Sequence, residues 1–288
     1  MAQHTLELPE VDLVYDVSGP LPTEDGQPPL VMIGQPMDAS GFQAQVALFP
    51  DRTVVTYDPR GLGRSIRKDG GVTNEPQTQA NDVHAMIEAL GAGPVDMLAS
   101  SGGAVTALAL VTAYPNDVVT LVAHEPPIDS VLPDAEAVQR ARAAYTQVYQ
   151  DKGWGAGMAA FIAMTSWEGE VTDEYLAQPA PDPAAFGMPT DDDGTREDPL
   201  LSERSWAVPL YQPDFAALTA APTRIVVAAG EESLKVYTGR TAIALAERLG
   251  QQVTVFPSHH GGFMGGEFGY AGQPEAFAAT LREVLGKP

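Results

Sequence analysis

The stretch that decides the fold reads Pro94-Val95-Asp96-Met97-Leu98-Ala99-Ser100-Ser101-Gly102-Gly103-Ala104-Val105-Thr106-Ala107-Leu108. The mostly apolar residues before Ser101 predict a strand, and the small and apolar residues after it predict a helix. A chain that turns this sharply from strand to helix strains the residue at the turn and lifts its side chain clear of the backbone. Small residues two positions away, Ala99 and Gly103, let the strand and the helix approach each other. The same five residues also fit an ordinary turn in which Ser101 caps the helix.

Composition limits the classes of protein to which the chain can belong. With 288 residues, 44% of them hydrophobic, the chain can hold one large α/β domain or a core with an insertion. The net charge of −22, with no basic stripe, argues against nucleic acids and anionic membranes as partners. The absence of cysteine excludes a disulfide framework, a thiol nucleophile and a cysteine-bound metal.

No segment has the pattern of a signal peptide or the length of a membrane span. We therefore expect a soluble, cytoplasmic protein that acts on a small molecule. The sequence leaves its oligomeric state open.

Short apolar strands alternate with helical segments on both sides of Ser101. Strands are predicted at residues 13–17 (an edge strand), 30–33, 52–57, 94–98, 118–123, 223–228 and 252–256, and helices at 78–90, 104–111, 239–249 and 274–285. This alternation predicts a mostly parallel sheet with helices on both faces.

Residues 127–213 interrupt the alternation. We therefore expect a core of residues 1–126 and 214–288 with an inserted cap, in which residues 135–149 and 156–164 form helices. Residues 168–198 contain ten acidic residues, one arginine and several prolines. This composition predicts a mobile, solvated loop.

The order of these features resembles the α/β-hydrolase superfamily over essentially the whole chain. The run Asp58-Pro59-Arg60-Gly61-Leu62-Gly63-Arg64-Ser65 is similar to the D-x-R-G-x-G-x-S loop that precedes the nucleophile in that fold. The turn at Ser101 (with alanine in place of the first glycine of G-x-S-x-G), the late His260 and the cap insertion fit the same pattern. The resemblance implies the α/β-hydrolase fold with a helical cap and a serine nucleophile at position 101. Haloalkane dehalogenases and epoxide hydrolases of this superfamily use an aspartate, which serine at 101 does not match.

The resemblance places the general base in the loop after the last predicted strand, where His259 and His260 stand. Glycines after His260 let that loop fold back over the turn, which favours His260. Of the other histidines, His4 falls in the N-terminal tail and His84 on a solvent-facing position of a helix.

In this fold a carboxylate orients the catalytic histidine, and together with the serine they form a catalytic triad. Two residues of this sequence are candidates for that carboxylate. The family most often places it after the strand at residues 223–228, where Ser233 occupies the expected position and Glu232 could serve after a shift of one residue. A second location in the family is the end of the preceding strand, which holds Glu125. We favour Glu125, because a glutamate at a strand end beside His124 is hard to explain as a solvated surface charge.

The resemblance also implies an oxyanion hole formed by the backbone N–H groups of Gln35 and Gly102. The usual histidine of this loop is replaced by Ile33, but neither donor depends on it. The side-chain amide of Gln35 is a further candidate donor, as the asparagine of the haloalkane dehalogenases is. Pro36 has no N–H and cannot serve.

These features predict a serine hydrolase that cleaves an ester, lactone or related acyl bond through an acyl-enzyme. No metal or organic cofactor is implied. The cap side chains Trp154, Phe161, Met164 and Trp167 either shape an apolar pocket for the substrate or form the cap's own core.

Two other enzyme activities fit the same residues: a cofactor-free perhydrolase or haloperoxidase, and hydrolysis of a carbon–carbon bond in a diketone. A different class, a catalytically idle hydrolase fold that binds a small molecule, is favoured by the departures at Ile33 and Ser233. Fold alone does not name the substrate.

Overall fold

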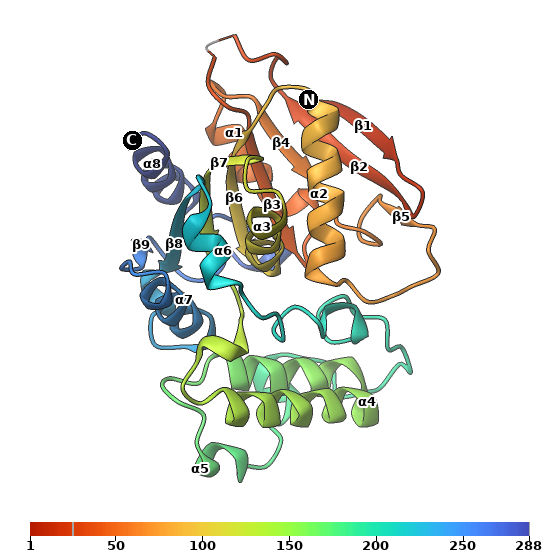
Figure 1. The fold of residues 1–288 in the computed structure, drawn as a ribbon. Coiled ribbons are helices and arrows are strands. Elements are labelled where there is room, and N and C mark those ends of the chain that lie inside the picture. The colour runs from red at the N-terminus through yellow and green to blue at the C-terminus, as the bar shows by residue number, and fades with distance from the viewer. Residues whose placement is uncertain (25, 288) are drawn as a thin grey trace.

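The computed structural model describes residues 1–24 and 26–287. Within them, one sheet of nine strands runs through the core (Figure 1). The strands are β1 (Ala2–Glu7), β2 (Val11–Ser18), β3 (Leu30–Gln35), β4 (Val54–Tyr57), β5 (Ile66–Arg67), β6 (Val95–Ser101), β7 (Val118–His124), β8 (Arg224–Gly230) and β9 (Thr254–Phe256). Their order across the sheet is β1-β2-β4-β3-β6-β7-β8-β9, and β5 pairs with β2. The pairs β4–β3, β3–β6, β6–β7, β7–β8 and β8–β9 are parallel, whereas β2 is antiparallel to β1, β4 and β5. The mostly parallel sheet expected from the sequence is confirmed.

The N-terminal strand differs from the expectation. β1 pairs with β2 along its whole length, so residues 13–17 lie inside the sheet rather than at its edge, and His4 belongs to a strand rather than to a tail. The ring of His4 stacks on Tyr15 at 5.1 Å between centroids. Nearly all of β1 is exposed, so it has no alternation of buried and exposed residues. Its strand conformation depends on backbone pairing with β2, which no local pattern encodes.

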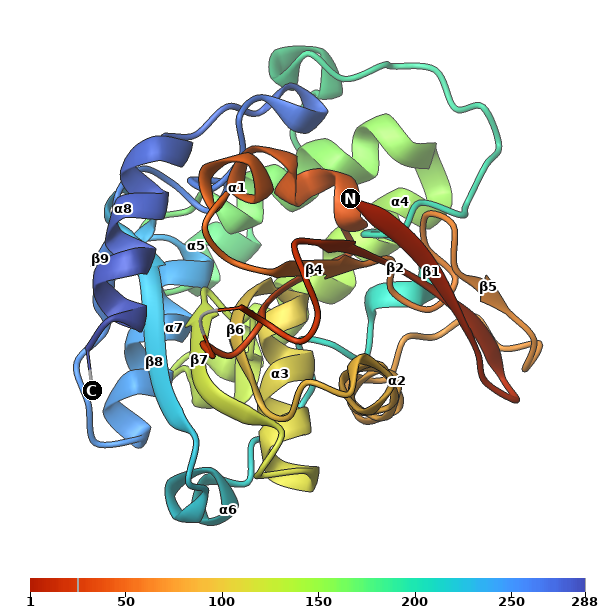
Figure 2. The ribbon, with the colours of Figure 1, turned by 90° about the horizontal axis from the view of Figure 1, so that it is seen from above.

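Helices cover both faces of the sheet. They are α1 (Gln43–Leu48), α2 (Pro76–Leu90), α3 (Gly102–Ala113), α4 (Ala135–Thr165), α5 (Asp173–Leu176), α6 (Phe215–Ala220), α7 (Tyr237–Arg248) and α8 (Pro274–Leu285). Short 3-10 turns lie at Ala39–Phe42, Asp129–Val131, Pro183–Phe186, Glu203–Ser205, Glu231–Ser233 and Glu267–Gly269. Figure 2, in which the molecule is turned to be seen from above, shows α1 and α8 on one side of the sheet and α2 and α3 on the other. The buried residues form one hydrophobic cluster on each face, with α7 packed on the side of α2 and α3.

Local sequence explains how α2 and α3 form. α2 buries Val83, Met86 and Ile87 on one face and ends at Gly91, whose φ of 63° is a left-handed cap that glycine adopts at little cost. α3 is buried on all sides through its first ten residues, as expected for a helix that starts at the middle of the sheet. A Cβ at Gly103 would lie 2.7 Å from the Cα of Gly34, so only glycine allows β3 and α3 to approach this closely.

The run at residues 58–65 has a structural role beside the site. The buried Asp58 carboxylate accepts the backbone N–H of Ala39 at 3.0 Å and that of Arg64 at 2.7 Å, which fixes the chain that follows β3. Arg60 is also buried and forms a bidentate pair with Asp82 at 2.7 and 2.8 Å. These bonds hold the loops around the ends of β3 and β4 in place.

Figure 1 shows α4 to one side of the sheet and the helices that cover it. Ile128, Val131 and Val208, from the same inserted stretch, belong to the core cluster on the side of α2 and α3, so the boundaries 127–213 of the cap stay a prediction. α4 contains the two helices expected at 135–149 and 156–164, joined at Gly153, whose φ of 85° and ψ of −174° break the helix. The cap has its own cluster of buried apolar side chains. Asp134 at the start of α4 pairs with Arg240 of α7 at 2.5 Å, which attaches the cap to the core.

Residues 168–198 contain α5 and one 3-10 turn, and most of their side chains are exposed. Their mobility stays a prediction. None of the helices in the described residues is both long enough and apolar enough to span a membrane.

Candidate active site

Ser101 is the last residue of β6 and directly precedes α3. Its φ of 56° and ψ of −129° put it in a strained backbone conformation, as the sharp turn requires. Ser101 occupies the N-cap position, but its side chain makes no capping hydrogen bond. The hydroxyl is therefore not used by the helix, and the residue lines a cavity of about 760 Å³ between core and cap.

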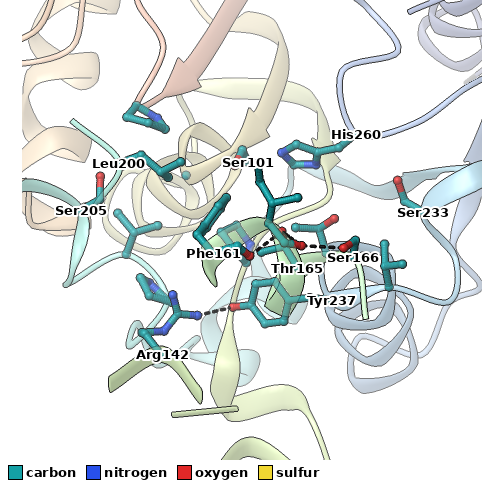
Figure 3. Close-up of a pocket in the computed structure, with 18 of the residues that line it drawn as sticks. Ser101, Arg142, Phe161, Thr165, Ser166, Leu200, Ser205, Ser233, Tyr237 and His260 are labelled. Atoms are coloured by element: carbon teal, nitrogen blue, oxygen red, sulfur yellow. Dashed lines mark hydrogen bonds between the residues drawn. The ribbon is translucent and has the colours of Figure 1, made fainter. Parts of the chain in front are cut away.

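His260, in the loop after β9, lines the same cavity, and Figure 3 shows its ring beside Ser101. Its Nδ1 lies 2.6 Å from Oε2 of Glu125, and the His260 side chain is 35% exposed. Glu125 directly follows β7 with a φ of 49°, which turns its side chain toward the loop after β9. The structure therefore brings together three of the expected residues, of which Glu125 and His260 are 135 positions apart in the sequence.

Glu125 is fully buried, and several donors converge on its carboxylate. Oε1 accepts the backbone N–H of Gly230 at 2.8 Å, and Oε2 accepts the Thr238 hydroxyl at 2.5 Å. Burial alone would raise the pKa of Glu125, but the neighbouring His260 and these hydrogen bonds outweigh burial and hold its pKa well below the usual range. The carboxylate is thus ionised and held in one orientation.

The alternative acid lies elsewhere. Glu232 is exposed on the 3-10 turn after β8 and lines the cavity, while the buried Ser233 occupies the place where the family usually has an aspartate. The backbone N–H of Glu232 bonds to the carbonyl of Ser258 at 3.1 Å. The carboxylate in contact with His260 is that of Glu125, not that of Glu232.

His259 also lines the cavity, but both of its ring nitrogens have partners. Nδ1 accepts the N–H of Gly261 at 3.0 Å, and Nε2 lies 3.0 Å from the carbonyl of Ala271. The ring stacks on Tyr270 at 4.0 Å. These contacts fix the loop and leave His260 as the histidine directed at Ser101 and Glu125.

His124 lies beneath these residues and is fully buried. Its Nδ1 is 3.1 Å from the Ser100 hydroxyl, and the ring makes edge contacts with Phe256 and Phe277. Burial lowers the pKa of His124 to about 4, so this histidine is neutral at physiological pH. Its Nε2 has no hydrogen-bond partner among the described residues and lies 3.8 Å from Oε1 of Glu125.

Gln35, at the end of β3, is paired in register with Ser101 of β6 and is almost fully buried. A Cβ at Gly102 would lie 3.1 Å from both the Cβ and the carbonyl oxygen of Gln35, so the two residues are packed together at the cavity. The side-chain Oε1 of Gln35 accepts from Nε2 of Gln79 at 2.5 Å, a contact that the sequence did not indicate. The Nε2 of Gln35 is buried and has no partner among the described residues.

Of the four cap side chains singled out in the sequence, Phe161 lines the cavity. The other three have different surroundings. Met164 is buried in the cap's own core, Trp154 donates from Nε1 to Asp198 at 2.8 Å, and Trp167 packs on Tyr175 at 5.0 Å. Phe161 and Met164 are three positions apart and share one side of α4, and Phe161 also packs against the cap's own core while it lines the cavity. Sequence spacing therefore could not tell which of the two side chains reaches the cavity.

Other cavity residues were not expected from the sequence. Ile162, Leu200, Trp206, Val208 and Val236 give the cavity an apolar wall.

A polar group made of Arg142, Tyr145 and Tyr237 also lines the cavity. In Figure 3, Arg142 and Tyr237 lie at the end away from Ser101 and His260. Among the described residues, no group of three or more His, Asp or Glu side chains is arranged to hold a metal ion.

Comparison with known proteins agrees with this architecture. The sequence matches the alpha/beta hydrolase family over residues 30–280. It is 28% identical to an uncharacterized hydrolase, YraK, of Bacillus subtilis (strain 168), over 98% of this chain and 96% of that protein. The fold is similar to a thermophilic esterase from Thermogutta terrifontis (TM-score 0.64, 20% identity, 99% of this chain and 98% of the other). It is also similar to an enol-lactonase from Burkholderia xenovorans (TM-score 0.61, 17% identity, 99% and 100%). Because the family match extends over most of the chain, this protein belongs to the alpha/beta hydrolase family and is a hydrolase.

Proposed function

We propose that the protein is a serine hydrolase that cleaves an ester or lactone through an acyl-enzyme. In this proposal Ser101 is the nucleophile, His260 the general base and Glu125 the acid. The observation that carries the proposal is the 2.6 Å contact between His260 and the buried Glu125, beside a serine with a positive φ at the wall of a cavity. This combination is the arrangement by which an alcohol is activated as a nucleophile.

Each residue then has a defined task. Glu125 accepts the Nδ1–H of His260, so that Nε2 is free to take the proton of the Ser101 hydroxyl as its oxygen attacks the acyl carbon. The negative oxygen that forms on the acyl carbon is stabilised by the N–H groups of Gln35 and Gly102. His260 returns the proton to the departing alcohol, which leaves the acyl group on Ser101. His260 then takes a proton from water, whose oxygen attacks the acyl carbon. It returns this proton to the Ser101 oxygen as the bond to the acyl group breaks, which releases the acid and restores the serine.

The cavity supports an acyl substrate of moderate size. Its volume of about 760 Å³ and its apolar wall suit a ligand with a hydrocarbon portion rather than a highly charged one. The net charge of −22 also disfavours polyanionic substrates. The esterase and enol-lactonase titles of the similar structures belong to the same class of acyl chemistry.

A fluorophosphonate probe tests the proposal, because it reacts with an activated serine and not with an ordinary one. The wild-type protein is expected to be labelled at Ser101 and to hydrolyse p-nitrophenyl esters, and Ser101→Ala is expected to lose both properties. Ser100→Ala is the matched control, because that hydroxyl contacts His124 instead of His260. A folded wild-type protein that takes no label would favour an idle fold that binds a small molecule. Exchange of the two phenotypes would assign the nucleophile to Ser100.

A further inference from the structure

The end of the cavity away from Ser101 is formed by a hydrogen-bonded cluster of four side chains: Arg142 and Tyr145 of α4, Tyr237 of α7, and Asp129. Arg142, Tyr145 and Tyr237 line the cavity, and Figure 3 shows the bond between Arg142 and Tyr237. Asp129 is fully buried and does not line the cavity. Three separate segments of the chain, from both core and cap, contribute to the cluster. The catalytic steps proposed above do not use it.

The bonds within the cluster account for most of its donors. Arg142 donates from Nε and Nη2 to the two oxygens of Asp129 at 3.2 and 2.9 Å. Nη2 also donates to the Tyr237 hydroxyl at 2.9 Å, and Nη1 donates to the Tyr145 hydroxyl at 2.6 Å. The Tyr237 hydroxyl donates a hydrogen bond to Oδ1 of Asp129 at 2.6 Å.

Two donors are left over. A guanidinium carries five N–H groups, and the bonds above use four of them. The Tyr145 hydroxyl accepts from Arg142, and its own proton has no acceptor among the described residues. Burial raises the pKa of the Tyr145 phenol, so that the hydroxyl keeps this proton. A nearly buried donor without a partner is costly, and here it belongs to a residue on the wall of a cavity.

The charge of the cluster limits what it can bind. Arg142 is already paired with Asp129, so the two side chains together are neutral. Glu232 adds an acidic side chain to the same cavity. A carboxylate entering this end would find no uncompensated positive charge to offset the loss of its hydration. A neutral oxygen acceptor costs much less to desolvate, and it can accept hydrogen bonds from both the remaining N–H of Arg142 and the hydroxyl of Tyr145.

We infer that this cluster is a substrate-binding subsite that recognises a neutral carbonyl oxygen carried by the substrate at a distance from the bond that is cleaved. The inference rests on the proposed function and specifies its substrate class: esters or lactones with a second carbonyl group, such as a ketone or an amide. The carbonyl can belong to the acyl part or to the alcohol part of the substrate. In either case Tyr145 is the specificity-determining residue, and Arg142 orients it.

The test compares esters that differ in one group. The acyl series is p-nitrophenyl octanoate and its oxo-octanoate analogues, in which one methylene after another is replaced by a ketone. The alcohol series places the ketone in the alkoxy chain of an octyl ester, and a third series ends in a carboxylate. For at least one ketone position we expect a kcat/KM equal to or above that of the plain ester. An unbonded carbonyl in an apolar pocket would lower it instead.

Tyr145→Phe removes the hydroxyl and keeps the ring. It is expected to lower the ratio of kcat/KM for the ketone ester over the plain ester by about tenfold, the effect of losing one hydrogen bond. Tyr175→Phe is the matched control, because Tyr175 packs on Trp167 in the cap and is not part of the cavity wall. This control is expected to keep the wild-type ratio. Arg142→Lys, which keeps a charge opposite Asp129, is expected to lower the ratio as well.

The outcomes separate this inference from the proposed function. If the plain ester is not cleaved and Ser101 takes no fluorophosphonate label, the proposed function fails. If the plain ester is cleaved but no ketone position retains its kcat/KM, or if Tyr145→Phe leaves the ratio unchanged, the subsite is refuted and the serine hydrolase stands. Faster cleavage of the carboxylate series would overturn the assignment of a neutral acceptor.

Discussion

The free energy of unfolding of this protein is expected to decrease as the pH is lowered from about 7 to about 5, because of one histidine, His124. It is fully buried, and burial lowers its pKa from 6.5 to about 4. Within this window the unfolded chain binds a proton at His124 and the folded protein does not. Unfolding therefore takes up a proton, and the free energy of unfolding decreases as the pH falls. This effect is complete below about pH 4 and absent above about pH 7.

The size of the effect follows from the two pKa values. One unit of pKa difference corresponds to about 1.4 kcal/mol, so the full difference is worth about 3 kcal/mol, of which about 2 kcal/mol is lost between pH 7 and pH 5. This is a large share of a total stability that is typically about 5–15 kcal/mol. Glu125 acts in a lower range, because a carboxylate with a depressed pKa loses its contribution below its ordinary value of 4.5.

The perturbation is the double variant Ser100→Ala/His124→Phe, compared with Ser100→Ala alone. Replacing both partners of the 3.1 Å contact avoids leaving the Ser100 hydroxyl buried without a partner, and phenylalanine suits the neighbouring Phe256 and Phe277. Free energies of unfolding are measured by urea denaturation across the pH range. Between pH 7 and pH 5, we expect the free energy of unfolding of Ser100→Ala to decrease by about 2 kcal/mol more than that of the double variant.

Parallel curves for the two variants would refute this reasoning, because they would mean that His124 does not resist protonation. Titrating groups that do not interact with His124 are present in both proteins and cancel in the difference. An NMR titration of wild-type His124 gives a direct second measurement. Protonation of that ring above about pH 6 would contradict the argument even if the double variant failed to fold.

Three further predictions concern the triad and the cap. Glu125→Gln is expected to lower kcat by a factor on the order of 10⁴, because His260 loses its orientation and the partner of its positive charge, whereas Glu232→Gln is expected to have a small effect. Steady-state kinetics measure both variants after circular dichroism has confirmed that they are folded. The reverse pattern would mean that the acid is Glu232. Ser101→Gly is expected to abolish hydrolysis and to raise the free energy of unfolding by about 1 kcal/mol relative to Ser101→Ala, since glycine adopts a φ of 56° without strain; equal denaturation midpoints would mean that the turn stores no strain. Limited proteolysis is expected to cut first within residues 168–198 and to leave the core folded, and hydrogen-exchange protection there comparable to that of the sheet would count against a mobile loop.

Local sequence was sufficient for the features that depend on neighbouring residues. The alternation of apolar strands and helices predicted a mostly parallel sheet, because a strand buried on both faces needs a continuous apolar run. The small residues around Ser101 predicted a strained turn, and the positive φ at that position agrees with it. The preference for His260 over His259 also had a local reason, since glycines follow His260, whereas the choice of that loop came from the family resemblance; the catalytic role of His260 stays a prediction.

Tertiary structure alone decided the features that join distant segments. Glu125 and Glu232 were both reasonable acids in the sequence, and only the folding of β7 beside β8 places one carboxylate 2.6 Å from His260, 135 positions away. β1 is exposed and has no pattern of its own, so its pairing with β2 supplies the reason for its conformation. Which side chains of α4 line the cavity depends on how the cap packs on the core. Periodicity identifies an amphipathic helix, but hydrogen bonds such as that from Arg142 to Tyr237 depend on the three-dimensional approach of residues 95 positions apart.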